Sequence, residues 1–327
     1  MLVTTPAPNE ARRRQESQEH MEREHPRHVG DATLRLLIED WSLPILRALM
    51  VGPRRPSELE DRLPDIPHSA LIRRLGELDK AHLADREHAA GLNPVSRYTL
   101  TRAGRMILAV ASAAERWEHR WSEIPNDGID ALRLIADEHT REILLALAPA
   151  PATPSTLERS VALTRSPLRR RLGELNGHGM LQRTGGSNRA SYRLTDSARD
   201  LVLVSMSAAR WEWEWNPPGH SPRAVNVARA LHIVGPRAEM SADVDGGVCS
   251  LHVDDGARGP TVQLAVGGRR VTALEAPSTE QPMASCHGSP RAWCHGLLLR
   301  DWDGVLSDGN RDIMAAILLS LTVAVVA

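Results

Sequence analysis

The apolar residues of the stretch RRPSELEDRLPDIPHSALIRRLGEL recur at helical spacing in two short runs separated by a sharp break. The second run places Leu71, Leu75 and Leu78 at i, i+4 and i+7, which puts them on one face of a helix. Pro64 and Pro67 interrupt the chain before that helix and mark a tight turn. The pattern predicts a helix-turn-helix whose second helix buries its leucines.

Two serines are placed to cap these helices. Ser57 has Glu60 three residues later, the pattern of a capping box, and Ser69 stands before the second helix. On this assignment Arg73 and Arg74 lie off the leucine stripe and face solvent. A helix that turns basic residues outward after a sharp turn is the arrangement that lies in a major groove of DNA.

The same stretch occurs twice, at an offset of about one hundred residues. RLGEL at Arg74 recurs unchanged at Arg171, and ILRAL at Ile45 is matched by ILLAL at Ile143. The chain has two tyrosines, and both lie at matching positions, in YTLT and YRLT. This period is too long for a solenoid repeat and indicates a duplicated domain.

Each copy continues into two short strands. LADREH and VSRYTL predict a β-hairpin, or wing, from which Arg86, His88 and Arg97 can reach a phosphate backbone. The wing of the second copy is expected over residues 182–194 and carries Arg189.

The segments WSLPILRALMVGPRRPSEL, IPHSALIRRLGELDKAHLADRE and SRYTLTRAG resemble the HxlR-type branch of winged-helix transcriptional regulators, which is related to the MarR type. The resemblance covers residues 31–121 and, at lower similarity, residues 127–215. It implies that the second helix of the motif and the wing contact DNA. It also implies that the protein binds a two-fold operator as a homodimer. The matching groove-facing positions are Pro67, His68, Ser69, Ile72, Arg73 and Arg74 in the first copy and Thr164, Arg165, Ser166, Arg169, Arg170 and Arg171 in the second.

Three features depart from the family pattern. Glu39-Asp40 stands where the family has Gly-Lys before the tryptophan, which removes a basic contact. The N-terminal cysteine that some members use as a redox sensor is missing. The two copies share one chain, so a monomer can imitate the family's two-fold dimer and read two half-sites, although a homodimer remains open. The two candidate recognition helices differ, which predicts unequal half-sites.

The last helix of each copy ends in paired tryptophans. Trp117 and Trp121 are four residues apart on one face of a helix capped by Thr101, and Trp211 and Trp215 repeat the spacing. Two interpretations stay open for these four residues. They either fill the contact between the copies or line a pocket for a small aromatic or hydrophobic ligand.

Composition sets limits on the partners. The 327 residues carry a net charge of −1, so affinity for double-stranded DNA must come from local clusters and depend strongly on salt. Three cysteines cannot all pair within one chain, which favours a reducing, cytoplasmic location. The longest apolar run, residues 313–327, is too short to span a bilayer, and no membrane partner is expected. Residues 1–30 read as a flexible charged arm, with a DNA-backbone arm or dimerising helix as the alternative.

Beyond a linker at residues 217–222, the pattern changes to strands at residues 247–254 and at residues 261–276, the latter folded at Gly267-Gly268. A helix opened by Ser289-Pro290 and an apolar helix from Ile313 follow. This order predicts a small α+β domain and resembles the sterol-carrier-protein-like lipid-binding domain of some regulators. The pairs Cys286-His287 and Cys294-His295 are spaced more widely than structural zinc ligands, so no metal or cofactor is expected.

The sequence therefore predicts a mainly α-helical protein with small β wings. Two tandem winged helix-turn-helix domains, at residues 31–125 and 126–217, precede an α+β sensing or assembly domain at residues 223–327. The predicted function is DNA-binding transcriptional regulation modulated by a ligand. The alternative is a small-molecule sequestering or self-resistance protein that keeps the fold and binds its ligand at the tryptophans. No acid, base, nucleophile or phosphate-loop motif indicates an enzyme.

Overall fold

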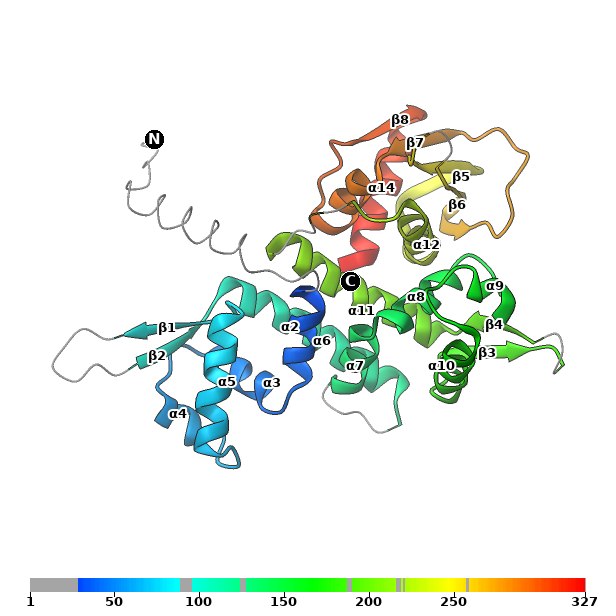
Figure 1. Cartoon of the computed structure of the whole chain (residues 1–327). Coiled ribbons are helices and arrows are strands. Elements are labelled where there is room, and N and C mark those ends of the chain that lie inside the picture. Colours follow the sequence, from blue (N-terminus) through cyan, green and yellow to red (C-terminus); the bar gives the residue numbers. More distant parts are fainter. Residues whose placement is uncertain are drawn as a thin grey trace, which may run out of the picture.

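The protein is described here by a computed structural model, which covers residues 29–88, 96–123, 128–186, 190–215, 219, 221–256 and 259–326. Two helical lobes lie at opposite ends of the molecule, each with a two-stranded hairpin that points outward, and a third unit rests on the middle (Figure 1). Of the predicted arm, residues 1–28 fall outside the described residues.

The first lobe, called the first repeat, contains five helices and a hairpin. Its elements are α2 (Val29–Ile38), α3 (Ser42–Leu49), α4 (Pro56–Glu60), α5 (His68–Lys80), β1 (Ala84–His88), β2 (Ser96–Leu100) and α6 (Arg102–Trp121). β1 and β2 pair antiparallel, from Ala84 opposite Leu100 to His88 opposite Ser96. This is a winged helix-turn-helix, as the sequence predicts.

The second repeat has the same order of elements. It consists of α7 (Ile129–Ala136), α8 (Glu138–Ala146), α9 (Pro154–Glu158), α10 (Arg165–Gly177), β3 (Leu181–Thr184), β4 (Ser191–Leu194) and α11 (Asp196–Trp215). β3 and β4 form an antiparallel hairpin. The two tyrosines also take matching roles, because Tyr98 bridges to Arg54 and Tyr192 bridges to Ala152.

The two expected serine caps are wrong by two positions. Pro56 is the first residue of α4, and the backbone N–H of Arg55 donates to the Glu58 carboxylate at 2.7 Å, so Ser57 lies inside the helix. α5 starts at His68 after an extended Pro67, without a side-chain cap. Proline suits the first helical turn because it has no N–H to satisfy there. The Thr101 cap is confirmed, since its hydroxyl accepts from the Gly104 N–H at 2.8 Å.

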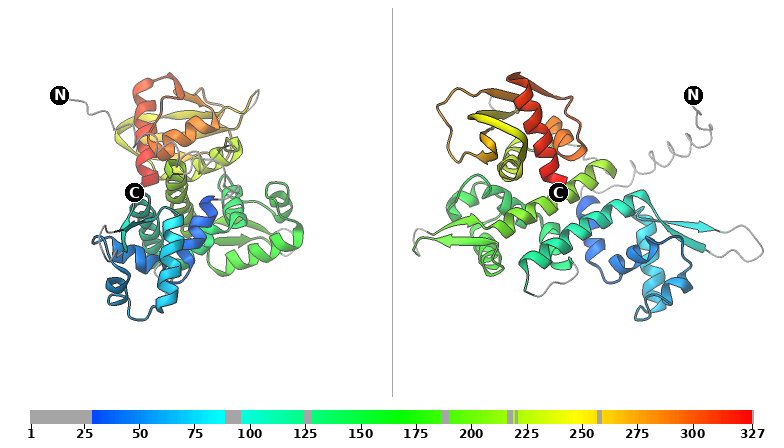
Figure 2. Two further views of the ribbon diagram at one scale, coloured as in Figure 1. Left: turned by 60° about the vertical axis from the view of Figure 1, so that its left-hand side comes forward. Right: turned by 180° about the vertical axis from the view of Figure 1, so that it is seen from behind.

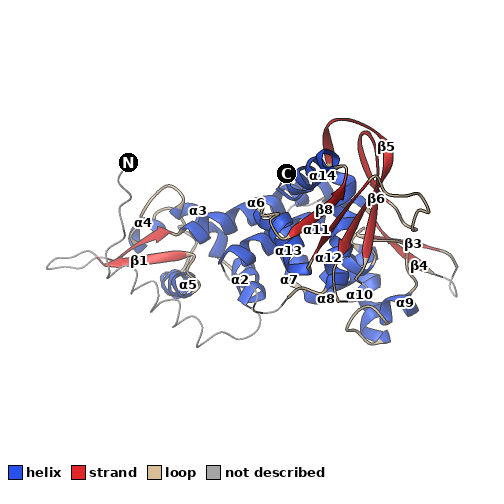
Figure 3. Cartoon of the chain, turned by 90° about the horizontal axis from the view of Figure 1, so that it is seen from above, coloured by secondary structure: helices blue, strands red, loops and turns tan. Residues whose placement is uncertain are grey.

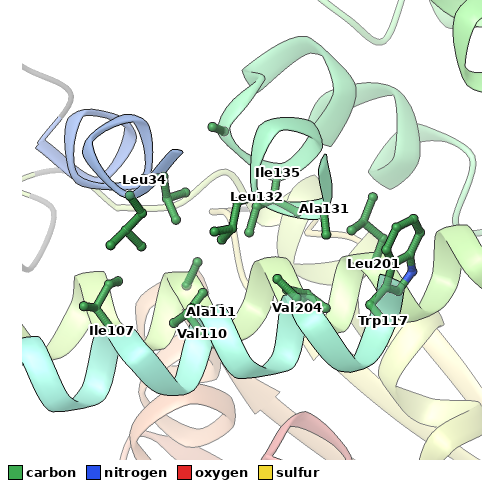
Figure 4. Close-up of a cluster of buried hydrophobic side chains, with 14 of the residues drawn as sticks. Leu34, Ile107, Val110, Ala111, Trp117, Ala131, Leu132, Ile135, Leu201 and Val204 are labelled. Atoms are coloured by element: carbon green, nitrogen blue, oxygen red, sulfur yellow. The ribbon is translucent and has the colours of Figure 1, made fainter. Parts of the chain in front are cut away.

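One continuous apolar core joins the two repeats. α6 and α11 lie side by side, and α2 and α7 pack across them (Figure 4). Leu34 from α2, Leu132 from α7 and Leu201 from α11 belong to the same buried cluster. The repeats therefore do not fold around separate cores, and each helps to bury the other's long helix.

Glu118 fixes the start of the second repeat. Its side chain is 1% exposed on α6, and its carboxylate accepts from the backbone N–H groups of Gly128 at 3.0 Å and Ala131 at 2.9 Å. These are N–H groups of the first turn of α7, which no helical carbonyl can satisfy. A carboxylate at a helix N-terminus is also favoured by the helix dipole.

The C-terminal unit, residues 224–326, is a four-stranded mixed sheet with helices on one face. It comprises α12 (Ala224–Val234), the short η1 (Gly235–Arg237), β5 (Glu239–Val253), β6 (Thr261–Ala273), β7 (Ala284–Gly288), α13 (Pro290–Cys294), a π-helical turn η2 (His295–Leu299), β8 (Val305–Gly309) and α14 (Arg311–Val326). The strand order is β6-β5-β7-β8, with β5 and β7 parallel. The α+β class is as predicted, while α12, β7 and β8 were not foreseen.

The inward side of this sheet follows the predicted alternation. Cys249, Leu251 and Val253 of β5 are fully buried. Val262 and Leu264 of β6 are at most 1% exposed. They pack against apolar residues of α12 and α14 in one core. The expected fold at Gly267-Gly268 is wrong, because β6 runs through both glycines. Gly268 instead adopts a φ of 59° where the register with β5 shifts, a bulge that glycine permits.

Among the described residues, no helix has the length and apolarity needed to cross a membrane. The two Cys-His pairs do not converge on one point. Cys286 is buried in the core, whereas the His287 ring stacks on that of His252 with centroids 4.2 Å apart. His295 meets the edge of the Trp213 indole. Within the part of the chain that is described, no group of three or more metal-ligating side chains occurs.

Candidate nucleic-acid interface and ligand sites

α5 has one buried face and one exposed face. Leu71, Leu75 and Leu78 are fully buried, which is the predicted stripe. The opposite face exposes His68, Ser69, Ile72 and Arg73. The His68 ring is paired with the Glu60 carboxylate at the helix start, and Arg73 Nη1 lies 3.3 Å from Glu77 Oε1.

The expectation that Arg74 faces solvent is wrong. Its side chain is 3% exposed, and its Nη2 lies 3.2 Å from Glu39 Oε2. Its Nε donates to the Asp40 carbonyl at 3.2 Å. Arg74 follows Leu71 by three residues and precedes Leu75 by one, which places it on the buried side of α5. It is held there because its guanidinium binds Glu39 and the Asp40 carbonyl, which lie just before α3. Arg74 therefore contacts the segment between α2 and α3 and does not face solvent.

α10 is the more basic of the two helices. Leu168, Leu172 and Leu175 are buried, and Arg165, Ser166, Arg169 and Arg170 are exposed as predicted. Arg171 is the counterpart of Arg74 and repeats its contact, with Nη2 2.8 Å from Asp137 Oδ2 and Nη1 3.1 Å from Glu174 Oε2. At 29% exposed, Arg171 is half-buried, and its assignment to the DNA-facing side stays a prediction.

The wings present further arginines. Arg86 and Arg97 are exposed on β1 and β2, and Arg86 Nε donates to Ser96 Oγ at 3.0 Å. Arg183 and Arg193 are exposed on the second wing, and sequence reasoning missed both. Arg183 lies opposite Tyr192 as Arg86 lies opposite Tyr98, so closer use of the repeat alignment could have found it. Arg189 and the side chain of His88 fall outside the described residues.

The candidate recognition helices occupy the same side of the molecule. α5 and α10 lie below the α6–α11 pair in Figure 1, and the C-terminal unit lies above it. The view from behind in Figure 2 has the same arrangement. Seen from above, the two wings point away from each other at the two ends (Figure 3). The side that bears α5 and α10 therefore faces away from the C-terminal unit, whereas Glu275 of that unit lies near the second wing, in a hollow that Gln182 and Arg193 also line.

Two tryptophans join the repeats by reciprocal hydrogen bonds. Trp117 Nε1 of α6 donates to the Ser197 carbonyl of α11 at 2.8 Å, and Trp211 Nε1 of α11 donates to the Ala103 carbonyl of α6 at 2.9 Å. Both indoles are buried. Each bond runs from the end of one helix to the start of the other, so α6 and α11 are antiparallel and related by a pseudo-two-fold axis. This contact confirms packing between the copies.

The expectation that the four tryptophans form one cluster is wrong. Trp121 Nε1 donates to Asp200 Oδ2 at 3.0 Å, while Trp215 Nε1 lies 3.3 Å from Met106 Sδ. The Trp117–Trp121 pair thus lies at the start of α11 and the Trp211–Trp215 pair at the start of α6. At 1.5 Å per helical residue the two pairs are about 20 Å apart. Because α6 and α11 are antiparallel, their C-terminal ends, which carry the tryptophan pairs, lie at opposite ends of the helix pair.

A hollow lies beside the Trp117–Trp121 pair, and the C-terminal unit helps to form it. A cavity of about 490 Å³ is lined by Trp117 and Trp121, with Ala324 and Val325 of α14 and Arg237 of η1 closing it from the C-terminal unit.

The charges in this hollow are mainly positive. Arg116, Arg120 and Arg237 border it, opposed by Asp200 alone. Asp200 is 9% exposed, is paired with Arg237, and has Oδ2 3.5 Å from Arg120 Nη1. Indole rings beside a surplus of guanidinium groups suit a planar aromatic anion.

The fold and the exposed basic helix define a helix-turn-helix protein. The profile of the HxlR-like helix-turn-helix family matches residues 36–125. The uncharacterized HTH-type transcriptional regulator sll1512 of Synechocystis is 34% identical over 96 residues, which make up 29% of this chain and 68% of that protein. The chain therefore belongs to the HxlR-like helix-turn-helix family.

Further relatives match the same part of the chain. The HTH-type transcriptional regulator YodB of Bacillus subtilis is 29% identical over 99 residues, or 30% of this chain and 88% of YodB. The solved structure of reduced YodB covers 28% of this chain and 90% of its own, with a TM-score of 0.27 and 29% identity. The family profile ends at residue 125, and the second repeat and the C-terminal unit lie beyond it.

Proposed function

We propose that this protein regulates transcription by binding double-stranded DNA through two winged helices carried on one chain. The reciprocal bonds of Trp117 and Trp211 carry this proposal. They relate α5 and α10 by a pseudo-two-fold axis, and a two-fold pair of recognition helices reads two half-sites. One chain then supplies the pair of helices that a homodimer supplies elsewhere, and a monomer is the expected binding form.

The two half-sites are expected to differ. α10 exposes Arg165, Arg169 and Arg170, whereas α5 exposes Arg73 alone among the predicted arginines. An exposed arginine can make a bidentate contact with guanine or bind a phosphate. The half-site read by α10 is therefore expected to be richer in guanine and to contribute more of the affinity.

Selection of bound fragments from random DNA tests this proposal. It is run with the full-length protein at two salt concentrations. The expected product is a pair of unequal half-sites whose centres are about 10 base pairs, or a multiple, apart. Affinity should fall steeply with salt because the contacts are largely to phosphates. A selected site with a single half, or no enrichment at either salt concentration, contradicts the two-site reading.

The hollow beside Trp121 supports a second component of the function, a ligand. We propose that it takes a planar aromatic acid, held by Arg120 and Arg237 and stacked against the indoles. The hollow is formed jointly by α6, α11 and the C-terminal unit, so a ligand there contacts both repeats. It alters DNA affinity only if it binds one spacing of the recognition helices better than another.

The alternative function, sequestration of a small molecule without DNA binding, rests on the same hollow. DNA affinity measured with and without saturating ligand distinguishes the two functions. A regulator loses or gains DNA affinity in saturating ligand, whereas a sequestering protein binds the ligand and has no salt-dependent affinity for DNA.

A further inference from the structure

A separate cavity lies where the second repeat meets the C-terminal unit. Its volume is about 240 Å³, and it is bordered by α8, α11, α12, α13 and η2. The walls that matter here are Leu145, Met206, Ala209, Trp213, Val227 and Leu297. None of the four tryptophans expected to bind a ligand borders it, and it shares no lining residue with the hollow beside Trp121.

Three polar side chains of this cavity, those of Arg141, Ser205 and Asn226, each have a hydrogen bond within the protein. The Arg141 guanidinium donates to the Ile135 carbonyl. Ser205 Oγ donates to the Leu201 carbonyl at 3.1 Å. Asn226 Oδ1 accepts from Arg229 at 3.5 Å. The inner surface is consequently almost wholly apolar.

The remaining reactive group of the lining is uncharged. Burial raises the pKa of the Cys294 thiol to about 12, so the sulfur stays protonated at neutral pH and acts as a small apolar group. Trp213 is 8% exposed. Its indole is held from the C-terminal side by the edge contact with His295, at 5.3 Å between centroids, and by the Arg291 guanidinium at 5.7 Å. The cavity thus combines aliphatic walls with one fixed aromatic ring.

We propose that this cavity binds a small, neutral, apolar compound of about two fused rings. A dry apolar cavity of about 150 Å³ binds benzene, and drug-sized ligands occupy about 300–1,000 Å³. A volume of about 240 Å³ lies between these. An ionised carboxylate would lose its hydration here, and the guanidinium of the lining, that of Arg141, already donates to the Ile135 carbonyl. Aromatic acids are therefore expected to bind more weakly here than at the hollow beside Trp121.

Binding of 1-naphthol to the full-length protein tests the site. The measurement uses no DNA, so its result does not depend on the proposed regulatory function. Calorimetry is expected to give saturable binding. With ¹³C-methyl methionine, the Met206 signal, assigned from Met206→Leu, should shift because an aromatic ring lies against it. The charged analogue 1-naphthoate should leave that signal in place. An unshifted Met206 signal at saturation, or an equal shift with 1-naphthoate, overturns the proposal.

Variants that fill the cavity supply a second criterion. Ala209→Phe on α11 and Ala230→Phe on α12 add a ring from two different helices of the lining, and each is expected to weaken 1-naphthol binding at least tenfold. Ala113→Phe is the matched control, because Ala113 borders the other hollow; its binding should equal that of the wild type. Circular dichroism identifies any variant that fails to fold. Wild-type affinity in either folded cavity variant shows that the compound binds elsewhere, and if neither folds, the Met206 signal decides.

Discussion

Arg74 forms an ion pair with Glu39, with 3.2 Å between Nη2 and Oε2. The second repeat preserves the relationship, with Arg171 2.8 Å from Asp137. In both repeats an arginine of the candidate recognition helix is bound to an acidic residue just ahead of the second helix of the lobe, α3 or α8. Glu39-Asp40 is therefore not simply the loss of a basic DNA contact. It is the partner that orients α5.

Replacing Arg74 should weaken the fold more than it weakens any direct DNA contact. We expect Arg74→Ala to lower the free energy of unfolding by about 1–3 kcal/mol, because it removes hydrogen bonds from Glu39 and from the Asp40 carbonyl. Arg73→Ala, on the exposed side of the same helix, is the control and should change it much less. Urea unfolding gives both values. Equal stability of the two variants would mean that the Arg74 contacts contribute nothing.

The α10 arginines should dominate DNA binding. We expect Arg169→Ala with Arg170→Ala to weaken operator binding more than tenfold and to reduce the salt slope by about two, with circular dichroism unchanged. Arg73→Ala in α5 should have a smaller effect. The charge control is Arg270→Ala with Arg311→Ala, since both residues are exposed on the C-terminal unit. Equal losses in the two double variants would point to net charge alone.

Loss of Glu118 should loosen the joint between the repeats. Glu118→Ala leaves the N–H groups of Gly128 and Ala131 without their acceptor, and each buried, unsatisfied group costs about 1–3 kcal/mol. The free energy of unfolding is expected to fall by at least about 2 kcal/mol. Glu123→Gln, at an exposed position, serves as the comparison. A wild-type unfolding midpoint for Glu118→Ala would mean that water replaces the carboxylate.

The hollow beside Trp121 should bind 1-naphthoate. Arg237→Ala and Trp121→Leu are expected to weaken binding more than tenfold, because they remove a cation and an aromatic wall. Trp215→Leu is the matched control, since Trp215 is the pseudo-symmetric counterpart of Trp121 and does not border the hollow. Calorimetry on the three variants checks this. A loss in Trp215→Leu equal to that in Trp121→Leu would place the acid elsewhere.

The cysteines should be unreactive in the folded protein. Burial raises the pKa of Cys249 to about 11 and that of Cys286 to about 12. A raised thiol pKa stabilises the fold below the ordinary pKa, and this contribution is lost as the pH rises toward the folded values. At pH 8 iodoacetamide should modify the native protein slowly and the urea-unfolded protein quickly, as read by mass spectrometry. Rapid modification without urea would indicate local opening of the C-terminal unit.

Local pattern in the sequence was sufficient for the elements of the repeats. The spacing of Leu71, Leu75 and Leu78 determines a buried stripe, and duplication of RLGEL places a second such helix at α10. Strand alternation in β5 and β6 was equally readable. Such signals depend on side chains a few residues apart, which share a face for geometric reasons. α12 also has helical spacing, at Val227, Leu231 and Val234, which the adjoining proline-rich linker obscures in the sequence.

Only the tertiary structure decided which residues of those elements are free to act. Arg73 and Arg74 are neighbours in sequence, yet the acidic residues ahead of α3 bury one and leave the other exposed. Equivalent tryptophans end about 20 Å apart because α6 and α11 pack antiparallel. The C-terminal unit then contributes a wall to the hollow beside Trp121, and Trp215 does not border that hollow. These outcomes depend on contacts between segments that are 35 residues apart in one case and 80 to 108 residues apart in another, and short-range periodicity does not encode such contacts.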